Sequence, residues 1–174
     1  MAIIFLFPTS MEAEAFRLAA PDAEVAICGV GMAAAAGSVA EILASRSDLN
    51  LVLLAGVAGS YDLSKVALCE VVEVSVEQIE ELPDRFAQRY EIAARFELPR
   101  VRSNSVNQSN YPAKDSDIEQ MEGAAVAAIC ERLSIPFAEV RAISNYVGDR
   151  FEKWCIKGAL EALTASLLEI YNRK

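Results

Sequence analysis

Short apolar runs alternate with helix-forming segments along the chain, and this alternation restricts the fold more than any other feature. The apolar runs predict buried strands at residues 2–7, 25–28, 51–55, 68–76, 101–106 and 137–143. The segments between them predict helices at residues 11–20, 32–46, 118–133 and 151–171. Strands that alternate with helices predict an α/β fold in three layers, with a mostly parallel or mixed central sheet flanked by helices.

The length and composition fit one globular domain. The chain has 174 residues, of which 53% are hydrophobic and 24% charged. This is enough to build a sizeable core, and the sequence contains no repeat, linker or low-complexity segment. We therefore expect a single domain over residues 1–174.

The charge and the missing histidines exclude several functions. The formal net charge of -9 repels phosphate backbones, so we expect no binding to nucleic acid. The chain has no histidine, which excludes Ser-His and Cys-His catalysis and most zinc chemistry. The cysteines form no C-x-x-C pair, so we expect free thiols, no metal and a reducing compartment.

No segment indicates export or a membrane. The apolar run at residues 2–7 is short, lacks a basic flank and ends at Pro8, which favours a buried strand over a signal peptide. No other segment approaches the apolar length of a membrane span. We expect a soluble cytoplasmic protein without membrane contacts.

Three loops follow predicted strands at residues 8–14, 56–62 and 144–150. In open α/β sheets, ligands bind beyond the carboxyl ends of the strands. A binding site is therefore expected where these loops meet. The segment at 56–60 carries two glycines and is predicted to be a turn that a ligand approaches closely, although a plain tight turn is the alternative.

Four segments together resemble the purine nucleoside phosphorylase and nucleosidase superfamily. They read FPTSMEAE at 7–14, AGVAGS at 55–60, QMEGAA at 120–125 and VRAISN at 140–145. Within the superfamily, the chain is similar to the methylthioadenosine/S-adenosylhomocysteine nucleosidases and, more nearly, to the futalosine hydrolases. Compared with these proteins it is shortened between about residues 77 and 100. The resemblance implies a nucleoside phosphorylase-like fold and cleavage of an N-glycosidic bond.

The resemblance implies that Glu14 activates a water molecule and that Arg141 is paired with that water and the nearby carboxylate. Glu12 is an alternative for the water-activating role because it lies only two residues away. A solvated glutamate in the first turn of a helix is the simpler interpretation of Glu14. For Arg141, an ordinary buried ion pair is the alternative, since an unpaired buried charge is costly.

By the same resemblance, Glu122 binds the ribose hydroxyls and Met121 forms an apolar wall beside the sugar. A carboxylate accepts hydrogen bonds from two hydroxyls and offsets positive charge that develops on the sugar. Gly59 and Ser60 are expected beside the ribose and the nucleophile. A surface glutamate followed by core residues is the alternative for Glu122.

Asn145 bears on the choice of base. Adenine-specific nucleosidases of the family have an aspartate at the matching position, whereas an asparagine amide donates to two acceptors, N7 and a C6 carbonyl oxygen. Asn145 therefore indicates a 6-oxopurine such as the hypoxanthine of futalosine, unless it merely caps a loop. Ser144 is expected to support the same base edge, and Asn107 to contact the base or ribose.

The sequence thus predicts a hydrolytic nucleosidase that needs no cofactor and works as a homodimer, as relatives usually do. A phosphorylase is an alternative, with Arg17 and Lys65 as the only basic candidates for a phosphate site. The other alternative is a degenerate nucleoside-binding protein without activity. The base-stacking aromatic stays open among Phe86, Tyr90, Phe96 and Phe151.

Overall fold

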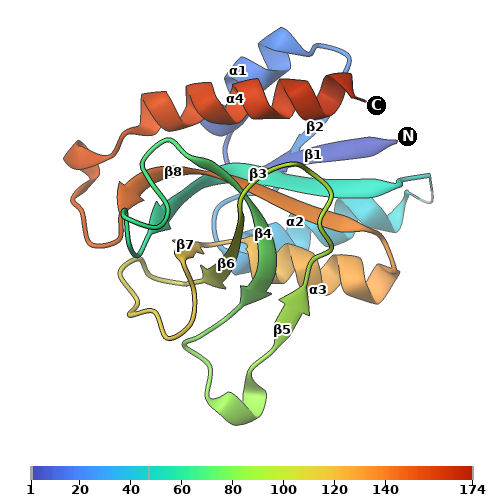
Figure 1. Cartoon of the computed structure of the whole chain (residues 1–174). Helices are drawn as coiled ribbons and strands as arrows, with labels where there is room; N and C mark the ends of the chain where they lie inside the picture. Colours follow the sequence, from blue (N-terminus) through green and yellow to red (C-terminus); the bar gives the residue numbers. More distant parts are fainter. Residues whose placement is uncertain (1, 47, 174) are drawn as a thin grey trace.

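A mixed sheet forms the centre of the computed structural model, which describes residues 2–46 and 48–173 (Figure 1). The N-terminal elements are β1 (Ile3–Phe7), α1 (Ser10–Ala19), β2 (Glu24–Ile27), α2 (Met32–Ala44) and β3 (Leu51–Ser60). The middle elements are β4 (Val71–Gln78), the 3-10 turn η1 (Asp84–Phe86), β5 (Arg89–Glu91), β6 (Arg100–Ser105) and β7 (Ile118–Gln120). The C-terminal elements are α3 (Gly123–Leu133), β8 (Phe137–Tyr146), the 3-10 turn η2 (Phe151–Lys153) and α4 (Ile156–Asn172).

The sheet has an open parallel half and a closed half. Strands β2, β1, β3 and β8 run parallel to their neighbours. Beyond them, β3, β7, β6, β4 and β8 pair with one another in a closed ring. The expected three-layer α/β architecture is confirmed, and the sheet is of the mixed kind because β7 and β4 run antiparallel to β3 and β8.

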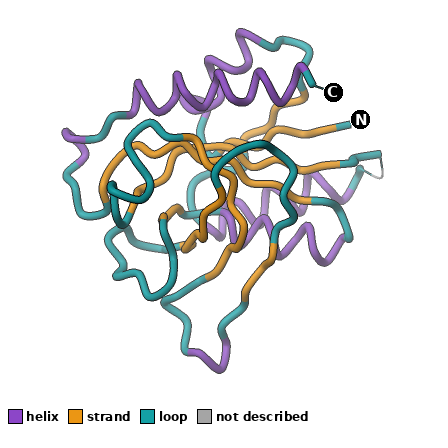
Figure 2. Tube along the Cα trace, in the orientation of Figure 1, coloured by secondary structure: helices purple, strands orange, loops and turns teal. Residues whose placement is uncertain are grey.

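Helices cover both faces of the open half, with α1 and α4 on one side and α2 and α3 on the other (Figures 1 and 2). Alternating side chains of β1 supply the two cores. Phe5 and Phe7 pack with Phe16 of α1 and Leu163 of α4, whereas Leu6 packs with residues of α2 and α3. Because both faces are buried, these strands are uniformly apolar, as the sequence indicated.

The first helix begins at Ser10, one residue before its predicted start. Thr9 is its N-cap, and the hydroxyl of Thr9 accepts a hydrogen bond of 3.2 Å from the backbone N–H of Glu12. Such a cap satisfies one of the free amides of the first helical turn. The cap therefore fixes where the first turn of α1 begins, directly after β1.

The prediction of a helix at 118–133 was wrong for residues 118–122. Residues 118–120 form β7, which pairs with both β3 and β6, and α3 begins only at Gly123. The N-cap residue is Glu122, and the side-chain oxygen of Gln120 accepts from the N–H groups of Glu122 and Gly123 at 2.6 and 2.7 Å. Strand pairing on two sides thus overrides the helical pattern and places Glu122 just before the helix.

Two further predictions need correction. The glycine-bearing turn at 56–60 is the second half of β3, which pairs with β8 across a bulge at Ala58 and Gly59. The closing helix begins at Ile156 instead of residue 151, because η2 comes first and leaves Trp154 outside the helix.

The segment from 77 to 100 contains η1 and β5. Its Tyr90 packs against Ala124 and Ala127 of α3, and β5 lies at one end of the strand order, where it pairs with β4. Of the helices in the described part of the chain, none is long and apolar enough to cross a lipid bilayer.

Candidate active site

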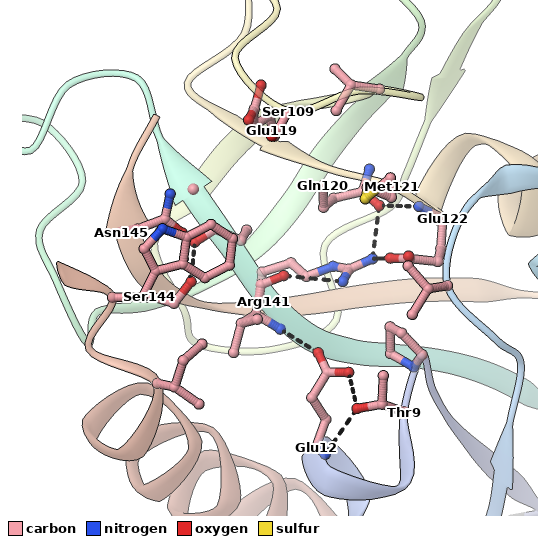
Figure 3. Close-up of a pocket in the computed structure, with 18 of the residues that line it drawn as sticks. Thr9, Glu12, Ser109, Glu119, Gln120, Met121, Glu122, Arg141, Ser144 and Asn145 are labelled. Atoms are coloured by element: carbon pink, nitrogen blue, oxygen red, sulfur yellow. Dashed lines mark hydrogen bonds and ion pairs between the residues drawn. The ribbon is translucent and has the colours of Figure 1, made fainter. Parts of the chain in front are cut away.

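A pocket lies where the parallel strands β1, β3 and β8 approach their carboxyl ends (Figure 3). Its volume is about 360 Å³, and its walls come from segments that are far apart in the sequence. One side holds Glu12, Glu122 and Arg141, which we call the carboxylate end. The other holds Ser144, Asn145, Phe151 and Trp154, which we call the amide end.

Glu12 is held by two hydrogen bonds at the carboxylate end. It is only 6% exposed and lies in the first turn of α1. Its Oε1 accepts from the N–H of Val57 at 3.0 Å, and its Oε2 accepts from the hydroxyl of Thr9 at 2.6 Å. The carboxylate is therefore fixed in orientation and keeps lone pairs that can accept from a water molecule in the pocket.

Gly56 lets the charged groups of this end come together. A methyl group added at Gly56 would lie 2.7 Å from Nη1 of Arg141 and 2.9 Å from Oε1 of Glu12. Both distances are shorter than a real side chain tolerates, so only glycine leaves room for the two side chains there. Gly56 was predicted to lie in a turn, but in β3 it is needed for this close packing.

Arg141 is fully buried and lies at the centre of a network (Figure 3). Its Nε donates to Glu139 at 2.8 Å, and its Nη2 donates to Glu122 at 3.3 Å and to the side-chain oxygen of Gln120 at 2.9 Å. Burial opposes its charge, but the carboxylates of Glu139 and Glu122 outweigh burial and raise the pKa of Arg141. The guanidinium is therefore charged and firmly placed.

Glu122 is 3% exposed and faces the pocket from the turn between β7 and α3. Its Oε1 accepts from the N–H of Gly31 at 3.0 Å, and its Oε2 is the partner of Arg141. Each carboxylate oxygen has two lone pairs, so Glu122 retains the capacity to accept from ligand hydroxyls.

The amide end is built from the last residues of β8 and the loop after it. The hydroxyl of Ser144 donates to Oδ1 of Asn145 at 2.7 Å, which orients the amide. The Nδ2 of Asn145 donates to the carbonyl oxygen of Tyr146 at 3.0 Å and has a second hydrogen for a ligand. Asn145 is therefore oriented as a hydrogen-bond donor at the wall of the pocket.

Two aromatic side chains line the same pocket as Asn145. The rings of Phe151 and Trp154 lie 5.4 Å apart at an angle of 49°, and Phe151 is 68% exposed. The indole N–H of Trp154 donates to the carbonyl oxygen of Asp149 at 3.2 Å. Of the four aromatic candidates from the sequence, Phe151 lines the pocket, and Trp154 joins it there.

Six of the nine expected site residues line this pocket: Gly59, Met121, Glu122, Arg141, Ser144 and Asn145. Arg141 differs from expectation in its partners, which are Glu139, Glu122 and Gln120. The other three expected residues do not line this pocket. They are Glu14, Ser60 and Asn107.

Glu14 lies on the exposed side of α1 and lines a different hollow, between α1 and α4. Two residues along a helix correspond to about 200° of rotation, so Glu12 and Glu14 cannot face the same pocket. Ser60 is buried, and its hydroxyl accepts from the N–H of Asp62 at 3.2 Å. Asn107 is exposed and contacts Glu81, with its Nδ2 2.5 Å from Oε1 of that residue.

Glu119 and Trp154 line the pocket, although neither was predicted as a site residue. Glu119 lines the pocket from β7, accepts from the hydroxyl of Tyr61 at 3.0 Å, and has its pKa raised by burial. The helix predicted at 118–133 gave no reason to expect Glu119 in the site. In the observed strand at 118–120, alternate side chains point to opposite faces of the sheet, and Glu119 lines the pocket. Trp154 falls within the helix predicted at 151–171, and no local signal placed it in a loop.

The pocket is acidic. Among the described residues that line it, Arg141 is the only basic one, whereas Glu12, Glu119 and Glu122 are acidic. Arg17 and Lys65, the basic candidates for a phosphate site, do not line it. Within the described residues, no group of three or more Cys, Asp and Glu is placed to hold a metal ion.

Comparisons with known proteins agree with this fold. Residues 99–172 match the family model of the phosphorylase superfamily, which covers β6 to α4. No curated protein matches the chain in sequence. The resemblance to this superfamily is thus confirmed for the part of the chain that includes Glu122, Arg141 and Asn145.

Solved structures extend the likeness to the whole chain. The 5'-methylthioadenosine nucleosidase of Arabidopsis thaliana superposes with a TM-score of 0.83 at 16% identity, covering 98% of this chain and 94% of that chain. A 5'-methylthioadenosine/S-adenosylhomocysteine nucleosidase from Campylobacter jejuni gives 0.80 at 14% identity, with 100% of both chains covered. A futalosine hydrolase mutant of Helicobacter pylori gives 0.83 at 13% identity, with 99% of both covered. The chain therefore has the fold of these nucleosidases.

Proposed function

We propose that the protein is a nucleosidase that hydrolyses the N-glycosidic bond of a purine nucleoside. The observation that carries the proposal is the pocket itself, in which Glu12, Glu122 and Arg141 face Asn145 across one cavity. Hydrolysis of this bond requires a nucleophilic water, stabilisation of a cationic sugar and a partner for the departing base. The two ends of the pocket supply these functions separately.

At the carboxylate end, Glu12 accepts a proton from the attacking water. Its two hydrogen bonds, from Val57 and Thr9, hold the acceptor oxygen in place before the reaction begins. A fixed general base of this kind contributes about 10²–10⁴-fold to a rate. Glu12 replaces Glu14 in this role because only Glu12 lies in the pocket.

Glu122 accepts from the ribose hydroxyls and offsets the positive charge that develops on the sugar. Arg141 holds Glu122 through the contact of 3.3 Å between Nη2 and Oε2, and Met121 forms the wall beside it. The acidic lining favours water over phosphate as the nucleophile, because a phosphate dianion would meet three carboxylates and one arginine that is already paired.

At the amide end, the Nδ2 group of Asn145 donates to N7 or to the C6 oxygen of the base. Both atoms are acceptors in a 6-oxopurine, whereas the C6 amino group of adenine is a donor and would face a donor. Asn145 therefore favours a 6-oxopurine nucleoside such as inosine or futalosine. Phe151 and Trp154 offer apolar ring surface for the base.

The test is incubation of the purified protein with inosine, futalosine, adenosine and methylthioadenosine, each with and without phosphate, and identification of products by mass spectrometry. Hypoxanthine released without phosphate is the expected result. Release of adenine would retain the nucleosidase and reject the role of Asn145. Ribose 1-phosphate would identify a phosphorylase, and ligand binding without any release would identify a nucleoside-binding protein.

A further inference from the structure

Behind Arg141, outside the pocket, two glutamates face one another in the core. Glu77 comes from β4 and Glu139 from β8, and both are 0% exposed. Neither lines the pocket. Two buried carboxyl groups at close range are a costly arrangement when both are charged, so their charge state requires an explanation.

Three hydrogen bonds occupy one oxygen of each carboxyl group and leave the second oxygen of each group without a partner. Oε1 of Glu77 accepts from the hydroxyl of Ser105 at 2.8 Å and from Nε2 of Gln120 at 3.0 Å. Oε1 of Glu139 accepts from Nε of Arg141 at 2.8 Å. Among the described residues, the remaining oxygens, Oε2 of Glu77 and Oε2 of Glu139, have no hydrogen-bond partner, and the charge of Glu139 acts on Glu77.

Gly123 shows that these two oxygens point to one place. A methyl group added at Gly123 would lie 2.4 Å from Oε2 of Glu77 and 2.6 Å from Oε2 of Glu139. Both oxygens therefore lean over the same glycine at the start of α3. A side chain at position 123 would push them apart, which gives this glycine a role in bringing the pair together.

We propose that Glu77 and Glu139 share a single proton and act together as positioning residues for Arg141. The proton lies on Glu77, whose Oε2–H donates to Oε2 of Glu139, and Glu139 keeps the one negative charge that pairs with the guanidinium. The two unsatisfied oxygens then satisfy each other. The pair presents one charge to Arg141 instead of two, so Arg141 remains available to Glu122 on its pocket side.

The surrounding charges support this assignment. The charged and titratable groups that face the pair are Arg141 from β8 and Glu122 from the turn before α3, with Glu12 of α1 acting on Arg141 from the pocket. Burial, followed by the charge of Glu139, raises the pKa of Glu77 well above its usual range. Burial also raises the pKa of Glu139, but Arg141 opposes this and keeps Glu139 the charged partner.

Thermal unfolding as a function of pH tests the shared proton without any assumption about activity. A carboxyl group whose pKa is raised by folding stabilises the protein below its unfolded pKa, and this stabilisation is lost as pH rises through the folded pKa. Glu77→Gln imitates the protonated acid and cannot lose its proton. We expect the Tm of E77Q relative to the wild type to rise as pH increases from about 5 to about 8.

Glu73→Gln is the matched control. Glu73 is also fully buried in β4, but it accepts from the backbone N–H groups of Arg95 and Phe96 at 2.8 and 3.5 Å. A glutamine there loses an acceptor for those groups, so we expect E73Q to lower Tm without recovery at higher pH. A Tm difference between E77Q and the wild type that stays constant with pH would overturn the shared proton.

Infrared spectroscopy of the wild type covers the case in which E77Q does not fold. At neutral pH we expect the C=O stretch of a protonated carboxyl group, which both E77Q and E139Q lack. A wild-type spectrum without this band would also overturn the proposal.

The effect on turnover rests on the proposed function: E77Q is expected to keep it within about threefold, and E77Q/E139Q to lose at least about tenfold. If the wild type shows no turnover, only the prediction about turnover fails, and the shared proton is still tested by Tm and infrared spectroscopy.

Discussion

The two ends of the pocket are built in different ways. At the carboxylate end, Glu12, Glu122 and Arg141 come from or adjoin regular elements, and each makes hydrogen bonds or ion pairs inside the protein. At the amide end, Phe151 and Trp154 lie in the loop after β8, and Phe151 is largely exposed. The difference indicates that the scaffold fixes the groups proposed to act on water, sugar and base, Asn145 of β8 included, whereas a loop carries the aromatic rings proposed to contact the base.

The largest expected effect is at Glu12. Because Glu12 is the proposed base for water, Glu12→Gln is expected to lower kcat by about 10²–10⁴-fold while leaving nucleoside binding nearly unchanged. Steady-state kinetics together with calorimetric binding measure both effects. Glu14→Gln is the control and should retain full activity, since Glu14 lies outside the pocket. Equal losses in both variants would contradict the assignment of the base to Glu12.

Arg141 tests the rigidity of the carboxylate end. Arg141→Met leaves Glu139 and Glu122 buried without their cation, so we expect about 3–5 kcal/mol lower free energy of unfolding. Denaturant titration measures this loss. A matched change at the exposed Arg173, whose ion pairs are at the surface, should cost less than about 1 kcal/mol. Similar costs at both positions would mean that the network does not hold this end together.

Asn145 tests selection at the amide end. Asn145→Asp can accept a proton and then donate to N7, and its other oxygen accepts from a C6 amino group. We expect kcat/KM to shift toward adenosine relative to inosine by about 10–100-fold. The measurement is the ratio of kcat/KM for adenosine to kcat/KM for inosine, in the wild type and in a variant that changes Asn145 and leaves Ser144 in place. An unaltered ratio would remove Asn145 from base recognition.

The smallest expected effect is at Trp154. Trp154→Ala removes apolar ring surface beside Asn145, which is worth about 1 kcal/mol, or roughly a fivefold increase in KM with kcat retained. Steady-state kinetics with the preferred nucleoside measure it. A loss confined to kcat would place Trp154 with the reacting groups and weaken the distinction between the two ends.

The sequence predicted the carboxylate end better than the loops. Strands buried on both faces are largely apolar, so β1, β3 and the core of β8 were found, and Arg141 stands out there as the basic residue of β8. The strand at 118–120 was missed because its pairing partners, β3 and β6, are distant in sequence. The predicted strands at 68–76 and 101–106 correspond to β4 and β6, but the closure of the ring by their pairing with β8 and β7 was missed for the same reason.

The error at Glu14 has a different origin. Position along the chain does not distinguish Glu12 from Glu14, and only the rotation of α1 relative to the sheet decides which one faces the pocket. The pair of Glu77 and Glu139 also lay beyond local patterns, because β4 and β8 meet only in the folded sheet. Sequence patterns therefore identified the elements and several site residues, but not which side chains come together between elements.

The most direct measurement is the fate of oxygen in the cleaved sugar. The wild-type protein is incubated with its preferred nucleoside in ¹⁸O-water containing phosphate, and the sugar product is analysed by mass spectrometry. If Glu12 activates water in this pocket, the free ribose carries one ¹⁸O atom incorporated by the enzyme, when corrected for exchange in an unlabelled ribose control. Ribose 1-phosphate as the product would contradict hydrolysis and assign the pocket to phosphorolysis.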